Sequence, residues 1–115
     1  MTKIRPRNAM KPTSVTMHPN AHEELLDLCV LVRGSHQDVM RDAVQRAVRN
    51  GMALHVPEWV LQRRHHSRKT RRPKMLYLRP EDSAALWKLQ RQLDLNASRT
   101  MEVCLHSAWL AHHAK

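Results

Sequence analysis

Residues 13–48 carry the pattern that sets the architecture of this chain, TSVTMHPNAHEELLDLCVLVRGSHQDVMRDAVQRAV. Val15 and Met17 alternate with hydroxyl side chains, which is typical of a short, half-buried strand. Pro19 ends that strand and suits the first turn of a helix. Apolar residues then recur at helical spacing, so we expect a helix over residues 19–33. Its stripe consists of Leu25, Leu28 and Val32, broadened by Leu26, Cys29 and Leu31.

A second helix is expected after a short turn. Gly34 offers a left-handed stop for the first helix. Ser35 is a good N-cap for the next one, and Asp38 three residues later makes a short version of a capping box. Asn50-Gly51 ends this second helix. Its apolar stripe consists of Met40, Ala43, Val44, Ala47 and Val48.

The same order of strand, helix and helix returns 61 residues later without an insertion. Val15 corresponds to Leu76, and Pro19 corresponds to Pro80. A second strand is expected over 75–78, followed by a helix and by a final helix that runs to about residue 113, with Asn96 and Ser98 as candidate caps. Leu95-Asn96 stands in the second turn where Arg33-Gly34 stands in the first, and Asn tolerates a left-handed backbone.

The repeat predicts how the two halves are joined. An isolated strand leaves its backbone groups unpaired, so each strand needs the other. We expect a mainly α fold with a two-stranded antiparallel β-ribbon, four helices under one face and the other face free. Exchange of strands between two chains, giving a true dimer, is the alternative. The expected divisions are a basic flexible arm (1–10), repeat 1 (11–51), a linker with a basic run that could hold a short helix (52–72), and repeat 2 (73–115), the two repeats forming one domain.

The net charge of +10 is unevenly distributed along the chain. Two segments contain the excess, and the rest is close to neutral. Such basic segments around a neutral body suit polyanion binding through release of counterions from a phosphate backbone. A linker kept in solution by its charge is the alternative. The two groups of cations are Lys3, Arg5, Arg7 and Lys11, and Arg63, Arg64, Arg68, Lys69, Arg71, Arg72 and Lys74.

The layout resembles the ribbon-helix-helix family of DNA-binding proteins. The resemblance rests on VTMHP at 15–19 and GSHQDVMRDA at 34–43, and it covers about 11–50 and 73–113. Family members are usually homodimers, whereas a tandem copy in one chain is similar to the relaxosome accessory protein of F-type conjugative plasmids. The resemblance therefore implies a tandem ribbon-helix-helix pseudo-dimer.

In that family the ribbon enters the major groove and the start of each second helix grips a phosphate. Carried over, this implies base contacts from the outward residues Ser14, Thr16, Met75 and Tyr77. Met75 and Tyr77 depart from the polar residues usual there, although a thymine-methyl contact and a tyrosyl hydroxyl bond remain available. The implied phosphate contacts are Lys11, Ser35, His36, Gln37, Lys74, Asn96, Ser98 and Arg99, with Arg68, Lys69, Arg71 and Arg72 from the basic run.

The expected function is therefore sequence-specific binding of double-stranded DNA, as a transcriptional repressor or regulator or as a plasmid-transfer accessory protein. Further copies of the chain on the DNA, and a protein partner in a transfer or regulatory complex, are the expected associates. No apolar run approaches the roughly 20 residues that span a bilayer, and the amino end has no signal-peptide pattern, so we expect a cytoplasmic protein with no membrane partner.

Three other functional classes compete with DNA binding. An enzyme is not expected, because the chain has no Gly-rich phosphate loop, no recognisable nucleophile setting and no paired carboxylates in apolar surroundings. No cofactor is expected, although the nine histidines, including the pair His18 and His22, invite a metal hypothesis. An RNA-binding module or a protein adaptor using Trp59, Trp87 and Trp109 is the runner-up; the repeat makes Trp87 and Trp109 packing residues.

Overall fold

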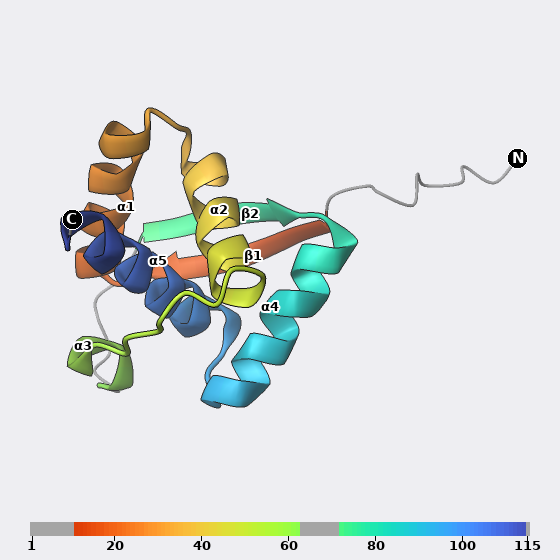
Figure 1. The fold of residues 1–115 in the computed structure, drawn as a ribbon. Helices are drawn as coiled ribbons and strands as arrows, with labels where there is room; N and C mark the ends of the chain where they lie inside the picture. The colour runs from red at the N-terminus through yellow and green to blue at the C-terminus, as the bar shows by residue number, and fades with distance from the viewer. Residues whose placement is uncertain (1–10, 63–71, 115) are drawn as a thin grey trace, which may run out of the picture.

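The chain forms two strands and five helices over the residues that its computed structural model describes, 11–62 and 72–114. It is mainly helical with one two-stranded antiparallel sheet, as expected from the sequence (Figure 1). In chain order the elements are β1 (Lys11–Met17), α1 (Pro19–Val32), α2 (His36–Val48), α3 (Glu58–Leu61), β2 (Arg72–Leu78), α4 (Pro80–Leu93) and α5 (Ala97–His113).

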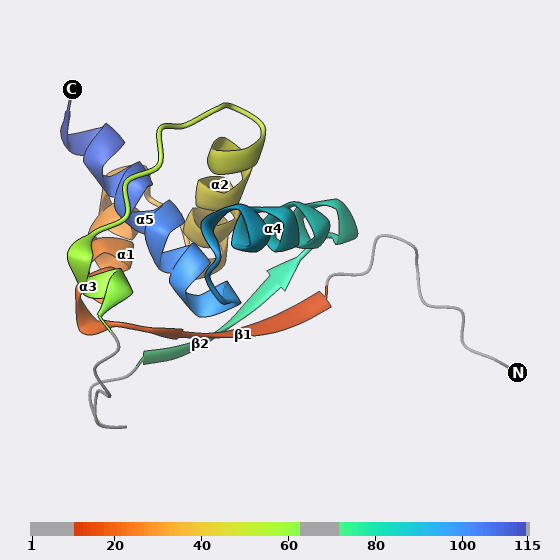
Figure 2. The same cartoon turned by 90° about the horizontal axis from the view of Figure 1, so that it is seen from below.

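The ribbon lies as one layer, with α1, α2, α4 and α5 together on one side of it (Figure 2). α1 and α4 each pack against both α2 and α5, so α2 and α5 form the middle of the helical layer. The inward residues of both strands are fully buried, as the alternation predicted. They are Val15, Met17, Leu76 and Leu78, and they join a core that includes Leu25, Leu28, Met40, Val44, Leu86, Leu89, Met101 and Leu105.

The second strand is longer than the sequence predicted. Its pairing begins at Arg72, which the sequence assigned to the linker, and includes Pro73. Tyr77 donates its N–H to the side chain of Gln37 on α2, so this N–H points to the free edge of the strand. Residues two apart in a strand point their backbone groups the same way, so the backbone nitrogen of Pro73 also faces the free edge. A proline there removes no hydrogen bond from the ladder.

The turns between paired helices differ from the expectation in one respect. The left-handed residues are Arg33, with φ 53°, and Asp94, with φ 55°, rather than Gly34 and Asn96. The N–H groups of Arg33 and Gly34 both reach the carbonyl of Cys29, so two hydrogen bonds hold the first turn. These bonds offset the modest cost of left-handed backbone at a residue other than glycine.

The bounds of the elements recur at one spacing. β2, α4 and α5 begin 61 residues after β1, α1 and α2, respectively, and the two left-handed residues are also 61 apart. The ribbon pairs Ser14 directly with Met75, its equivalent at the same spacing. An antiparallel ribbon built from two equivalent strands has such a pair at its centre.

The segment between the repeats packs against α5. The sequence allowed a short helix from Pro57, and α3 follows that residue. Val60 on α3 is buried, and its carbonyl accepts a hydrogen bond from Nη1 of Arg99 at 2.8 Å. Further upstream, the N–H of His55 donates to Oγ of Ser107 at 2.8 Å. Residues 55–61 therefore cover part of α5.

Two smaller expectations concern the thiols and membrane spans. Cys104 is buried and Cys29 is half-buried, and both are free, in keeping with the prediction of packed thiols. Burial raises the pKa of Cys104 to about 12. Within 11–62 and 72–114, no helix has the length and apolar character needed to cross a membrane.

Candidate nucleic-acid interface

The four predicted base-contacting residues share the face of the ribbon that points away from the helices. Met75 and Tyr77 are 45% and 43% exposed, Ser14 is exposed and Thr16 is half-buried. Ser14 lies opposite Met75, whereas Thr16 and Tyr77 lie on either side of that pair, opposite Pro73 and Pro12. The face thus presents two hydroxyls, a thioether and a phenol, with the two halves chemically different.

Gln37 fastens the outer edge of β2 to the start of α2. Its Nε2 donates to the carbonyl of Met75, and its Oε1 accepts the N–H of Tyr77 at 3.0 Å. One turn later, Nε of Arg41 donates to the carbonyl of Tyr77 at 2.9 Å. Gln37 was predicted to contact a phosphate through its backbone, which stays a prediction, and its side chain completes the strand edge. The start of α2 therefore lies beside the outward face of the ribbon.

Ser98, at the start of α5, fastens the outer edge of β1 to that helix. Its Oγ accepts the N–H of Thr16 at 2.9 Å, so Ser98 is not the helix cap that the sequence allowed. Glu102, one turn later, accepts the N–H of His18 at 2.7 Å through Oε2. Ser98 and Glu102 are 61 residues after Gln37 and Arg41. The two helix starts consequently flank the two edges of the ribbon in equivalent ways.

Glu102 is a site residue that the sequence analysis missed. It is 5% exposed, and burial raises its pKa to about 7 despite the hydrogen bond from His18. The nearby Arg99 acts in the opposite direction by favouring the carboxylate. The sequence does contain a signal for this residue, since Glu102 lies between the apolar Met101 and Val103 in the final helix. A carboxyl group that is buried among apolar residues requires a hydrogen-bond partner.

Both flanking helices begin at an exposed capping residue, Ser35 or Asn96, followed by a half-buried first turn. Ser35 and Asp38 form the predicted capping box, and that bonding lowers the pKa of Asp38. Asn96 caps α5 through Oδ1, which accepts the N–H of Arg99 at 2.8 Å. These caps each satisfy one N–H of a first turn. The remaining first-turn N–H groups have no partner within their own helix, which is the usual basis of anion binding at such ends.

The predicted phosphate residues beside these turns have different surroundings. Lys74 lies on the helix-covered side of the ribbon, opposite Val15, and is half-buried. Burial and the charge of Lys74 together lower the pKa of His36 at the start of α2. Arg99, at the start of α5, is half-buried and bonds to α3, and it lines a cavity of about 310 Å³ with Thr16, Trp59, Ser98 and Glu102.

The rest of the predicted basic contacts are described only in part. The backbones of Lys11 and Arg72 lie at the first positions of β1 and β2, and their side chains fall outside what is described. Arg68, Lys69 and Arg71 also lie outside the described residues. All ten acidic residues lie inside them, together with eleven of the twenty Lys and Arg. The described body is therefore almost neutral.

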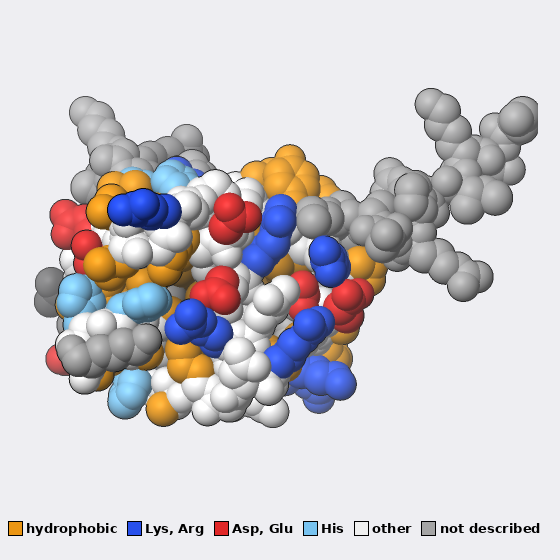
Figure 3. Space-filling view, turned by 45° about the horizontal axis from the view of Figure 1, so that its top comes forward, with side chains coloured by type: hydrophobic (Ala, Val, Ile, Leu, Met, Phe, Trp, Pro, Cys, Tyr) orange, Lys and Arg blue, Asp and Glu red, His pale blue; other side chains and the backbone are white. Residues whose placement is uncertain are grey.

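Charges of both signs are intermixed on the helical side of the molecule. Basic (blue), acidic (red) and apolar (orange) side chains alternate over the face drawn in Figure 3. The ion pair between Arg46 and Asp42, at 2.9 Å, is one such combination. A face of mixed sign is a poor surface for a polyanion.

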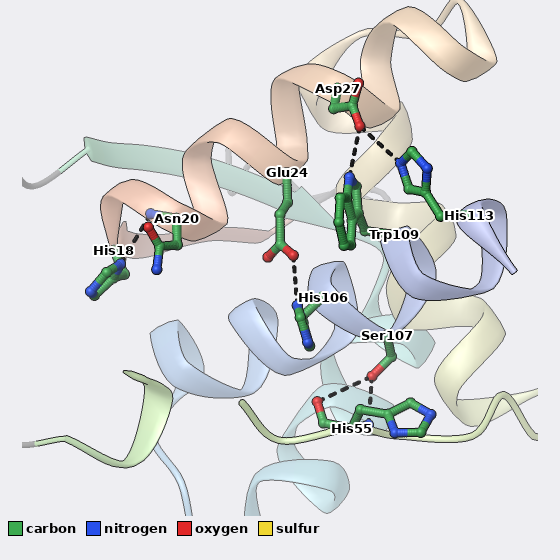
Figure 4. A network of polar contacts seen from close by, with 9 residues as sticks. All are labelled: His18, Asn20, Glu24, Asp27, His55, His106, Ser107, Trp109 and His113. Atoms are coloured by element: carbon green, nitrogen blue, oxygen red, sulfur yellow. Dashed lines mark hydrogen bonds and ion pairs between the residues drawn. The ribbon is translucent and has the colours of Figure 1, made fainter. Parts of the chain in front are cut away.

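A polar network on the helical side of the ribbon joins α1 to α5 (Figure 4). Glu24 lies 2.6 Å from Nδ1 of His106, and Oδ2 of Asp27 accepts from Nε1 of Trp109 at 2.7 Å. His113 lies 3.0 Å from the same oxygen of Asp27. No short-range pattern could have predicted contacts between residues 82 or more positions apart. They fix the two repeats against each other.

The predictions for the histidines and the tryptophans differ in how they stand against the structure. Among the described residues, no three His, Cys, Asp or Glu side chains are grouped so that they could hold a metal ion, and His65 and His66 lie outside them. Trp109 packs against the core, as predicted. The prediction for Trp87 is wrong, since it is 55% exposed on the outer side of α4. Its equivalent Leu26 is exposed too, because both lie off the helix face that meets the core.

Comparisons with known proteins add no relative. No family model, no curated protein and no solved structure matches the chain. The function is therefore inferred from the geometry of the ribbon and its two flanking helix starts.

Proposed function

We propose that this protein binds double-stranded DNA in a sequence-specific way, by placing the outward face of its ribbon in the major groove. The observation that carries the proposal is the register of the ribbon. Ser14 pairs with Met75 at the centre, and the start of one helix lies at each outer edge. In this proposal the chain is a tandem ribbon-helix-helix pseudo-dimer, with residues 11–51 and 73–115 as its two halves.

The dimensions of B-form DNA favour this use of the ribbon. The major groove is about 12 Å wide and admits a two-stranded β-ribbon, and each base pair presents a distinct set of donors and acceptors there. The hydroxyls of Ser14, Thr16 and Tyr77 can donate to or accept from base edges, and Met75 can contact a thymine methyl group. The first turns of α2 and α5 would then face the phosphates on either side of the groove.

The two half-sites should differ in sequence. Thr16 on one strand is replaced by Tyr77 on the other, and Ser14 is replaced by Met75. One half of the face is therefore smaller and more polar than the other. We expect an imperfect inverted repeat as the preferred site, rather than a true palindrome.

A transcriptional regulator and a plasmid-transfer accessory protein would use this surface alike, so both belong to the proposal. Either would work on chromosomal or plasmid DNA in the cytoplasm. RNA binding is less well supported, because the deep, narrow major groove of A-form RNA does not admit a ribbon.

The test compares two kinds of variant on a preferred duplex and on a scrambled duplex of equal length. Thr16→Ala with Tyr77→Ala should lower affinity for the preferred duplex by roughly tenfold or more, at about 1–3 kcal/mol for each base contact that is removed, and leave the scrambled duplex almost unaffected. Ser83→Ala, at a half-buried position of α4 that is not part of the outward face of the ribbon, is the control. Equal losses on both duplexes would contradict base contact by the ribbon.

A further inference from the structure

A cavity of about 310 Å³ lies where β1, α3 and the start of α5 meet, and we call it the α3 cavity. Its lining includes Thr16 and Met17 from β1, Trp59 from α3, and Arg99 and Glu102 from α5. Sites for small organic molecules have volumes of roughly 300 to 1,000 Å³ and combine apolar walls with a few polar groups. The α3 cavity is at the lower end of that range, so it suits one small ligand.

The two repeats differ at this place in a way that leaves room for a ligand. At the edge of β2, the long side chain of Gln37 reaches two backbone groups of the strand. Its equivalent at the edge of β1 is the shorter Ser98, which binds one backbone N–H. The segment between the repeats adds α3, which packs against α5 and lines the remaining space with Trp59.

Two opposite charges line the α3 cavity without neutralising each other. Nη1 of Arg99 donates to the carbonyl of Val60, which leaves the other N–H donors of the guanidinium group for a ligand. Oε2 of Glu102 accepts the N–H of His18, and this carboxyl group makes no other hydrogen bond to the described residues. Arg99 and Glu102 are both described and form no ion pair with each other. The cavity therefore offers one cationic and one anionic group.

The burial of Glu102 favours a ligand that brings a positive charge. Glu102 is 5% exposed, and burial raises its pKa to about 7. Arg99 acts in the opposite direction by favouring the carboxylate, but it is not in contact with it. An ammonium group inside the cavity would give the buried carboxylate the close opposite charge that the protein does not supply.

Trp59 gives the α3 cavity an apolar wall of fixed orientation. It is half-buried and packs against the core, and the centre of its ring lies 4.8 Å from the centre of the His18 ring. A tryptophan ring offers a large, flat apolar surface to a bound side chain. The cavity thus combines a cation, an anion and an aromatic surface.

We propose that the α3 cavity binds a free α-amino acid with an apolar side chain. The carboxylate of the ligand pairs with Arg99, its ammonium group pairs with Glu102, and its side chain packs on Trp59. A ligand with only one of these charges would leave the other charged group of the cavity without a partner. A molecule with both charges should therefore bind better than a simple amine or a simple acid.

Binding of the amino acid does not require DNA, so it can hold or fail separately from the proposed function. If both hold, the ligand lies beside the start of α5, which would face a phosphate. Each ligand should then change the affinity for the other by the same factor.

Calorimetric titration of the wild type in the absence of DNA is the first test. The probes are L-leucine, L-methionine and L-phenylalanine. For the amino acid that binds most tightly, the amine that lacks the carboxyl group and the acid that lacks the amino group are titrated next. The amino acid should bind at least roughly tenfold more tightly than either analogue, because each analogue loses one charge-assisted contact.

Two variants then assign each charge of the ligand to its partner. Glu102→Gln should weaken binding of the amino acid roughly tenfold and bind the acid at least as tightly as the wild type does. Arg99→Gln should weaken binding of the amino acid and bind the amine at least as tightly. Glu81→Gln and Arg91→Gln remove the same charges at exposed positions of α4 outside the cavity, and they serve as matched controls. Far-ultraviolet circular dichroism checks that each variant is folded.

The comparison of the amino acid with its two analogues needs only the wild type, so it decides the proposal even if a variant does not fold. No binding by any of the three amino acids, or an amine or acid that binds as tightly as the amino acid, would overturn the proposal. Equal losses for the amino acid and for both analogues in the two variants would do so as well.

Discussion

Glu102 connects the turn between β1 and α1 to α5 by a single carboxylate. It accepts the N–H of His18 at 2.7 Å and is almost fully buried. Its equivalent in the other half, Arg41, holds β2 through a carbonyl instead. The two halves thus reach the same arrangement with opposite charges. As a result, one half contains a carboxyl group whose ionised form is disfavoured by burial.

That burial predicts how stability varies with pH. The folded state holds the proton of Glu102 up to about pH 7, against 4.5 for the ordinary group, so between these values the folded state binds more protons than the unfolded one. Stability therefore falls as pH rises through this window, by about 3 kcal/mol or less. Glu102→Gln, which keeps an acceptor for His18, should flatten the dependence between about pH 5 and about pH 8.

Urea denaturation at a series of pH values measures this effect. Glu24, whose pKa burial also raises, contributes in the same direction and remains in both proteins. An identical pH profile for the wild type and Glu102→Gln would show that Glu102 ionises in the folded state as it does in the unfolded chain.

At the scale of elements, the ribbon depends on side chains that complete its edges. Gln37 binds the N–H of Tyr77, and Ser98 binds the N–H of Thr16, the equivalent amide of the other strand. Two unpaired edges would otherwise expose rows of donors and acceptors to another chain. The helix starts therefore fasten both edges of the ribbon to the helical layer.

Gln37→Leu should release one edge only. We expect the amide of Tyr77 to exchange with solvent faster, and the protein to lose roughly 1–2 kcal/mol of stability, while the amide of Thr16 is unchanged. Ser98→Ala should have the converse effect, which makes each variant the control for the other. Hydrogen exchange followed by NMR distinguishes the two amides. Equal acceleration of both would mean that the edges open together.

Most elements, but few of their edge contacts, could be predicted from the sequence. Alternation at Val15 and Met17 fixed the inward face of β1, and the repeat carried that orientation to Leu76 and Leu78. The start of β2 was missed, because Pro73 ends a strand unless its nitrogen faces a free edge. The left-handed residues Arg33 and Asp94 were missed as well, since hydrogen bonds in the turn outweighed the preference for glycine.

In the candidate site, too, the positions of residues could be predicted but their long-range contacts could not. The outward position of Ser14, Thr16, Met75 and Tyr77 followed from strand periodicity, and Ser35 capped its helix as the sequence indicated. The side-chain uses of Gln37, Ser98 and Arg99 did not follow, because their partners lie 38 or more residues away along the chain. Local patterns carry no information about such contacts.

For the whole molecule, the net charge of +10 lies largely outside an almost neutral body. In the proposed function these basic segments contribute a term to DNA affinity that is independent of sequence, whereas the ribbon contributes the preference among sequences. The two terms should respond differently to salt.

Neutralising the basic run by Arg68→Gln, Lys69→Gln, Arg71→Gln and Arg72→Gln should weaken binding to preferred and scrambled duplexes alike. The slope of log affinity against log salt should become shallower by about 0.9 for each phosphate that the variant no longer neutralises. Arg68→Lys with Arg71→Lys and Arg72→Lys keeps the charge and serves as the control. An unchanged slope in the neutral variant would exclude this segment from phosphate binding.

The most direct test of sequence-specific binding by the ribbon is selection of bound duplexes from a random DNA pool at near-physiological salt. The wild type and the Thr16→Ala, Tyr77→Ala variant should be carried through the same rounds. The wild type should enrich one short, imperfect inverted repeat, and the variant should enrich a degenerate form of it or nothing. No enrichment by the wild type, or the same motif from both proteins, would contradict the account.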